Sequence, residues 1–120
     1  MVCVTPRSNA APILESGRRN ADRFQAEFHV VYVQQPSLSE KDRLALQENL
    51  DFARGLGAEV EVLSGSNAAA AILDFARQKG ITQIFIGHST PKGAWGRLRS
   101  SLVDRLIRSA EGIDVVVYPE

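Results

Sequence analysis

The 120-residue sequence contains little cysteine and no long apolar run, and these shortages exclude several classes of protein. A single cysteine, Cys3, cannot close an internal disulfide, which favours a reducing compartment. No apolar run approaches the roughly 20 residues that span a bilayer, and the first residues lack the regions of a signal peptide. The formal net charge of zero gives the domain as a whole no electrostatic reason to bind nucleic acid or a membrane surface. We therefore expect a cytoplasmic domain that neither binds nucleic acid nor inserts into a membrane.

Motifs for covalent chemistry are absent as well. The sequence has no Walker A loop, no Gly-x-Gly-x-x-Gly fingerprint and no Gly-x-Ser-x-Gly nucleophile elbow. Cys3, His29 and His88 show no metal-ligand spacing. We interpret Cys3 as an inert buried thiol and His29 as a satisfied core or sheet-face histidine, since nothing in the sequence pairs with it. His88 follows a strand, where contact with a ligand is more plausible. The sequence predicts neither catalysis nor a metal site.

What the sequence does contain is a regular alternation of apolar strands and amphipathic helices. Apolar runs typical of buried strands occupy residues 2–4, 28–33, 60–63, 81–86 and 113–117. Helical spacing predicts a first helix over about 10–25, with Ile13, Leu14, Ala21 and Phe24 on its inner face and Gly17 where a neighbour approaches closely. Further helices follow predicted caps at Ser39 and Ser66, and a last one carries Leu98, Leu102, Leu106 and Ala110.

Five strands alternating with four helices define the expected fold class. Such strands need crossover connections, so the sheet is parallel and built from right-handed βαβ units. We predict a doubly wound, open α/β sheet in a single domain over residues 1–120. Because the first strand begins almost at the first residue, we also expect the chain to be part of a longer polypeptide. In such folds ligands bind beyond the carboxyl ends of the strands, where the strand order reverses.

The loop after the fourth predicted strand, from Gly87 to Ser101, is the most informative segment. It precedes a helix, so free backbone N–H groups and a positive helix end suit an anion. Hydroxyl groups and guanidinium groups suited to phosphate come from Ser89, Ser100, Ser101, Arg97 and Arg99. Residues 87–110 together carry a net charge of +4. Trp95 is placed to stack on a base; the alternative is that Ser100 is a helix cap and Trp95 a surface plug.

These elements and this loop resemble the universal stress protein family. Its ATP-binding members carry Gly-x2-Gly-x9-Gly-Ser/Thr, which falls here on Gly87, Thr90, Ser100 and Ser101. The first glycine and the final serine are kept, while the two middle glycines are replaced. A Cβ at either site obstructs approach of the backbone to a phosphate. The resemblance implies a three-layer sheet with strand order 3-2-1-4-5, and it disfavours conventional ATP binding.

Longer stretches resemble the universal-stress-protein-like domain of KdpD-type sensor histidine kinases. They are 2–4, 28–34, 56–60 with 63–65, 82–87, 101–106 and 112–117. This resemblance implies a cytoplasmic regulatory domain, without kinase activity of its own, in an osmosensitive potassium-response kinase of the inner (plasma) membrane. Some such kinases bind cyclic di-AMP through two motifs, of which Phe28 and Tyr32 keep the aromatic residues. The serine pair of the other motif falls on Thr5 and Arg7, with Ser8 adjacent.

The resulting hypothesis is a sensing or scaffolding module that binds a nucleotide, ATP or cyclic di-AMP, or a partner protein, and modulates kinase and phosphatase output. The candidate binding residues are Thr5, Arg7, Ser8, Tyr32, Gly87, Ser89, Arg97, Ser100 and Ser101. The expected partners are the rest of the parent kinase and a freestanding universal stress protein, and a homodimer stays open. The alternatives are a freestanding universal stress protein that binds ATP and a purely structural domain.

Overall fold

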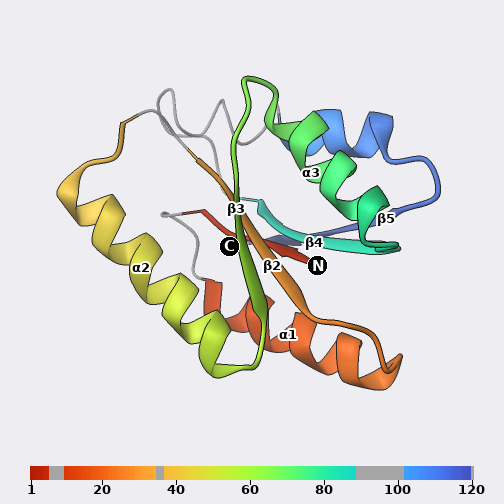
Figure 1. The fold of residues 1–120 in the computed structure, drawn as a ribbon, viewed down its shortest axis with the longest axis horizontal. Helices are drawn as coiled ribbons and strands as arrows, with labels where there is room; N and C mark the ends of the chain where they lie inside the picture. Colours follow the sequence, from red (N-terminus) through yellow and green to blue (C-terminus); the bar gives the residue numbers. More distant parts are fainter. Residues whose placement is uncertain (6–9, 35–36, 89–101, 120) are drawn as a thin grey trace.

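The computed structural model describes residues 1–5, 10–34, 37–88 and 102–119, without the side chains of residues 88 and 119. Strands and helices alternate along the chain (Figure 1). The elements are β1 (Val2–Cys3), α1 (Ala10–Arg23), β2 (His29–Val33), α2 (Glu40–Gly55), β3 (Glu59–Leu63), α3 (Ala68–Gln78), β4 (Gln83–His88), a helix over 102–109 and β5 (Asp114–Pro119).

The sheet confirms the predicted fold class and strand order. Its five strands run in the order β3-β2-β1-β4-β5, and each neighbouring pair is parallel. The short strand β1 lies in the middle, with Cys3 level with Val31 of β2 and with Ile86 of β4. Within the described residues, three labelled helices and the helix over 102–109 connect the strands. The alternation of apolar runs and helical spacing was thus sufficient to predict the layers.

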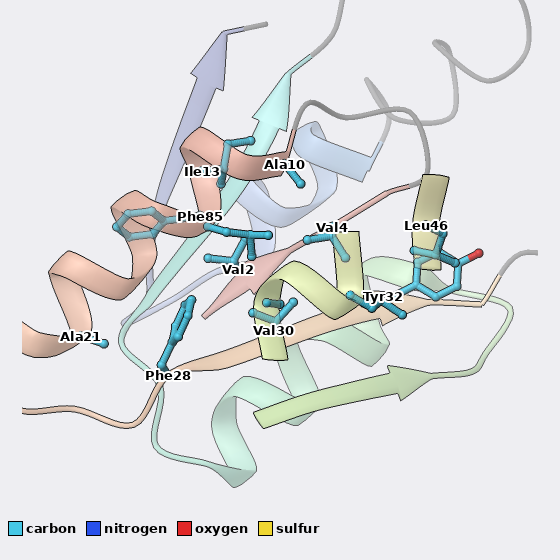
Figure 2. Close-up of a cluster of buried hydrophobic side chains, with 13 residues drawn as sticks. Val2, Val4, Ala10, Ile13, Ala21, Phe28, Val30, Tyr32, Leu46 and Phe85 are labelled. Carbon is cyan, nitrogen blue, oxygen red and sulfur yellow. The ribbon is translucent and has the colours of Figure 1, made fainter. Parts of the chain in front are cut away.

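Two apolar cores lie on opposite faces of this sheet. The first joins α1 and α2 to one face and includes Leu14, Val30 and Leu50; Figure 2 shows many of its side chains. The second joins α3 and the helix over 102–109 to the other face and includes Val31 and Leu106. All five residues of β2 are buried, because successive side chains of a strand point to opposite faces and both faces are covered.

Helix α1 approaches the sheet closely at Gly17, as the sequence predicts. A Cβ placed on Gly17 would lie 2.5 Å from Cγ2 of Val2 and 3.0 Å from Cε1 of Phe28. Because real Cβ contacts are longer than this, glycine is required for the observed spacing between α1 and β1. This close packing fixes the position of α1, and α1 connects β1 to β2.

Two details of the helices differ from the prediction. Helix α3 is capped by Asn67, whose side chain accepts a 3.1 Å hydrogen bond from the Ala70 amide, so the predicted cap at Ser66 is wrong by one residue. Phe24 is 63% exposed, so its placement on the inner face is also wrong. The reason is that α1 ends at Arg23 and Gln25 takes a φ of 52°, which turns the chain away before another helical turn is completed.

The other helix and strand signals agree with the structure to within a few residues. Ser39 caps α2 by accepting a hydrogen bond from the Asp42 amide. The fourth strand begins at Gln83, two residues later than predicted, because the Ile81 amide donates to the Ala76 carbonyl and so closes the end of α3. Among the described residues, none of the helices is long and apolar enough to cross a membrane.

Candidate functional site

The strand order places a topological switch point at the carboxyl ends of β1 and β4. From β1 the chain enters α1 on one face of the sheet, whereas the helix over 102–109, which lies between β4 and β5, packs on the opposite face. The connections after two adjacent strands therefore diverge, and ligands of doubly wound sheets bind at such points. Thr5 directly follows Val4 at the end of β1, and Gly87 lies near the end of β4.

Thr5 is positioned by both the sheet and α2. The Val4 amide donates to the Val31 carbonyl at 3.0 Å, which extends the pairing of β1 with β2 by one residue. The carbonyl of Thr5 accepts a 3.2 Å hydrogen bond from Nδ2 of Asn49. Thr5 is 9% exposed. Helix α2 therefore holds the point at which the chain leaves β1.

Gly87 and Tyr32 occupy the two strands beside β1. If the β1–β4 register is continued by one residue, Gly87 is level with Val4, and on its other side it pairs with Tyr118 of β5. Tyr32 is 5% exposed and belongs to the core cluster, with its ring beside Leu46 and its hydroxyl pointing away from the cluster centre (Figure 2). The ring thus has a packing role. Ligand contact by Tyr32 stays a prediction.

The remaining candidate residues lie outside the described part of the chain. These are Arg7, Ser8, Ser89, Arg97, Ser100 and Ser101, together with the replaced glycine position Thr90 and with Trp95 and Arg99. The described residues bring Thr5 and Gly87 to neighbouring strand ends. Whether the loops beyond them form one pocket stays a prediction.

Nearly the whole chain matches part of a known sensor protein. It is 30% identical over 120 residues to the sensor protein KdpD of Escherichia coli K12, and the match covers 98% of this chain. It is also 27% identical to KdpD of Clostridium acetobutylicum and 30% identical to KdpD of Mycobacterium tuberculosis, over 99% of this chain in both cases. This is a universal-stress-protein-like domain of KdpD type. The chain spans 13–14% of the length of these relatives.

Solved structures establish the fold of this KdpD-type domain. A universal stress protein from Burkholderia pseudomallei superposes with a TM-score of 0.62 at 18% identity, over 99% of this chain and 95% of that one. A universal stress protein from Archaeoglobus fulgidus superposes with a TM-score of 0.68 at 22% identity, over 99% of this chain and 43% of that one. A universal stress protein in complex with cAMP superposes with a TM-score of 0.63 at 20% identity, over 98% of this chain and 94% of that one. No protein-family model matches the chain.

Cys3 lies in the middle of the KdpD-type domain, and the prediction that it is a buried thiol is confirmed. It is 6% exposed on the central strand. Burial raises the pKa of the thiol to about 12, and the nearby amino-terminal ammonium opposes this shift. A thiol with such a pKa holds its proton at neutral pH. It therefore supplies no thiolate for nucleophilic attack or metal binding.

The interpretation of His29 as a buried histidine is confirmed, but the statement that nothing pairs with it is wrong. His29 is 2% exposed, and its Nε2 lies 2.9 Å from a carboxylate oxygen of Glu27. Its Nδ1 lies 3.4 Å from a carboxylate oxygen of Glu59 on β3. Glu27 could have been suspected from its i−2 spacing along a strand. Glu59 lies beside His29 because the two residues, 30 apart in the sequence, are register partners on β2 and β3. The sequence pattern does not determine that register.

Proposed function

We propose that this chain is a regulatory domain of a KdpD-type sensor histidine kinase that acts in a potassium-responsive two-component system. The observation that carries the proposal is the similarity of nearly the whole chain to one segment of KdpD from several bacteria. The sequence contains no Walker A loop and no Gly-x-Gly-x-x-Gly fingerprint. We therefore assign the chain a binding role on the cytoplasmic side of a membrane-anchored parent protein.

In this role the domain acts by changing a conformational equilibrium of the kinase. A ligand shifts such an equilibrium only by the difference between its affinities for the two states. Moving the parent kinase from 1:99 to 99:1 would require a ratio of about 10⁴ between those affinities. A ligand site on this domain can therefore change the ratio of kinase to phosphatase activity of the parent protein without taking part in phosphoryl transfer.

We propose an adenine nucleotide as the ligand that binds near the carboxyl ends of β1 and β4. Its support is the switch point between Thr5 and Gly87, the net charge of +4 over residues 87–110 and the serines of the 89–101 segment. A universal stress protein of the same fold is known in complex with cAMP. The replaced glycines at positions 90 and 100 disfavour ATP bound in the conventional way. The retained aromatic residues Phe28 and Tyr32 are the support for cyclic di-AMP.

The alternative ligand at the ends of β1 and β4 is a partner protein. The rest of the parent kinase and a freestanding universal stress protein are the partners that the resemblance implies. The two kinds of ligand predict different titrations, because a nucleotide would bind to the isolated chain whereas a docking surface would not respond to any nucleotide.

Calorimetric titration of the 120-residue chain with cyclic di-AMP, cAMP and ATP tests the nucleotide proposal. The double variant Arg97→Ala/Ser101→Ala removes two proposed phosphate contacts. It should weaken binding by at least about tenfold, since even one charge-assisted hydrogen bond contributes about 1.5–3 kcal/mol. Arg23→Ala, which removes an exposed arginine at the end of α1, is the matched control and should leave affinity unchanged.

Two results would contradict parts of the proposal. Absence of heat with all three nucleotides would reject a nucleotide ligand and leave protein docking as the role of the domain. Undiminished affinity in the Arg97→Ala/Ser101→Ala variant would reject the location assigned to the phosphate contacts.

A further inference from the structure

Away from the switch point, at the amino-terminal ends of β2 and β3, two carboxylate side chains lie beside a buried imidazole. Nε2 of His29 is 2.9 Å from Oε2 of Glu27, and Nδ1 is 3.4 Å from Oε2 of Glu59. One ligand atom from each of the three residues can be chosen so that all lie within 4.8 Å of one another. The imidazole is 3% exposed, whereas the carboxylates are 73% and 72% exposed.

The sheet itself builds this cluster. His29 and Glu59 are register partners on neighbouring parallel strands, so their side chains leave the same face of the sheet. Glu27 precedes His29 by two residues, and its side chain reaches the same ring. Phe75 of α3 packs against the ring with its plane at 81° and a centroid distance of 5.8 Å. The imidazole is therefore held by packing, while the two carboxylates reach it from the solvent side.

The arrangement of charges and lone pairs in this cluster favours a bound cation. A neutral imidazole carries one N–H, so it donates to one carboxylate while its other nitrogen presents a lone pair. Here both nitrogens face carboxylate oxygens. The second contact therefore sets a carboxylate oxygen against a ring lone pair, and a bound metal ion relieves that repulsion. Lys79 lines the same pocket as Glu27 and His29, and its Nζ lies 5.9 Å from the centroid of the Phe75 ring.

The donor set indicates which metal ion fits. Imidazole nitrogen and carboxylate oxygen together are ligands of Zn²⁺, whereas Mg²⁺ and Ca²⁺ prefer oxygen donors alone. Zinc bonds of about 2.0–2.2 Å in tetrahedral geometry place ligand atoms roughly 3.4 Å apart. Ligand atoms that lie up to 4.8 Å apart must therefore approach one another by up to about 1.4 Å. The carboxylate that faces the other ring nitrogen must also swing toward the nitrogen that binds the ion, which a long side chain in solvent does readily. The fourth position is left to water.

We propose that Glu27, His29 and Glu59 form a Zn²⁺ site that joins the start of β2 to the edge strand β3. The ion takes one nitrogen of His29 and one oxygen from each carboxylate. It links the segment before β2 to β3 and stabilises the folded chain, because the three ligands are brought together only by strand pairing.

Calorimetry of the 120-residue chain with Zn²⁺ in a non-chelating buffer tests the site. One ion should bind per chain, with a rise in the thermal unfolding midpoint that EDTA reverses. Glu27→Gln and Glu59→Gln should each weaken binding by at least about tenfold, as loss of a group that orients or binds a metal typically does. Glu61→Gln is the matched control. It changes an exposed glutamate on the same strand, two residues further on, and should bind Zn²⁺ as the wild type does.

Several outcomes would overturn the site. They are absence of saturable Zn²⁺ binding, equal losses in all three glutamine variants, and Mg²⁺ or Ca²⁺ binding as tightly as Zn²⁺. Circular dichroism of each variant verifies that the fold is kept. Arg97→Ala/Ser101→Ala should leave Zn²⁺ affinity unchanged. The proposal of a zinc site and the proposal of a nucleotide site are therefore tested independently.

Discussion

At the scale of single residues, Gly17 gives the most direct test of packing between α1 and the sheet. Gly17→Ala would place a Cβ 2.5 Å from a side-chain carbon of Val2, which is 0% exposed on the central strand. We expect the free energy of unfolding to fall by about 1–3 kcal/mol, as for other overpacked cores, although alanine favours the helix. Urea unfolding monitored by circular dichroism measures the change.

The control for this prediction is another glycine of a helix. Gly55 is the last residue of α2, and a Cβ added there meets no atom within 4 Å. Gly55→Ala should therefore leave stability unchanged or raise it by up to about 1 kcal/mol through helix propensity. Equal effects of the two substitutions would show that α1 does not pack against β1 as closely as described.

Sequence patterns identified buried residues well but identified their polar partners poorly. Cys3, Ile13 and Leu14 follow from apolar periodicity, and all are buried. Phe24 fits the same periodicity and is 63% exposed, because periodicity does not report where the helix stops. The carboxylate of Glu59 meets His29 through strand register, and that register depends on the whole sheet rather than on neighbouring residues.

At the scale of elements, the start of α3 distinguishes two adjacent capping candidates. The side chain of Asn67 accepts a hydrogen bond from the Ala70 amide, which satisfies one of the free N–H groups of the first turn. Asn67→Ala should lower the free energy of unfolding by about 1 kcal/mol. Ser66→Ala should change it by less than about 0.5 kcal/mol. Chemical denaturation of both variants measures the difference, and a larger effect at Ser66 would reject the assignment of the cap.

Elements were easier to predict than their ends, for a physical reason. Several apolar residues define each strand or helix, whereas a single hydrogen bond decides a cap or a first strand residue. Ser66 and Asn67 are both good caps by residue type, and only the backbone conformation selects Asn67. Likewise Ile81 reads as a strand residue, yet its amide is used to close α3. Most residues of the candidate site follow the ends of the predicted strands, where apolar periodicity gives no information.

At the scale of the whole molecule, the strand order decides where a binding site is possible. The apolar runs predicted five parallel strands, and the resemblance implied the order that the structure has. That order brings the ends of β1 and β4 together, although Thr5 and Gly87 are 82 residues apart in the chain. The proposed nucleotide contacts stay predictions because most of them belong to residues 6–9 and 89–101, outside the described chain.

Asn49 offers a test that connects the stability of the molecule to its proposed site. Its side chain on α2 donates to the carbonyl of Thr5 at 3.2 Å, so a helix residue fixes the point where the chain leaves β1. Asn49→Ala should cost about 1 kcal/mol of stability for the lost hydrogen bond. If the chain beyond Thr5 contacts the nucleotide, the variant should also bind it several-fold more weakly, because that loop must then be ordered on binding at about 1–2 kcal/mol per residue.

The matched substitution for Asn49→Ala is Gln47→Ala on the same helix. The amide of Gln47 is exposed and donates to Asp51 one turn later, so its loss should leave both stability and nucleotide affinity nearly unchanged. Denaturation and calorimetric titration of the two variants separate the effects. If Asn49→Ala loses stability but keeps full affinity for every nucleotide that the wild type binds, the loop after β1 takes no part in the site. The ligand contacts would then have to come from β4 and the segment that follows it.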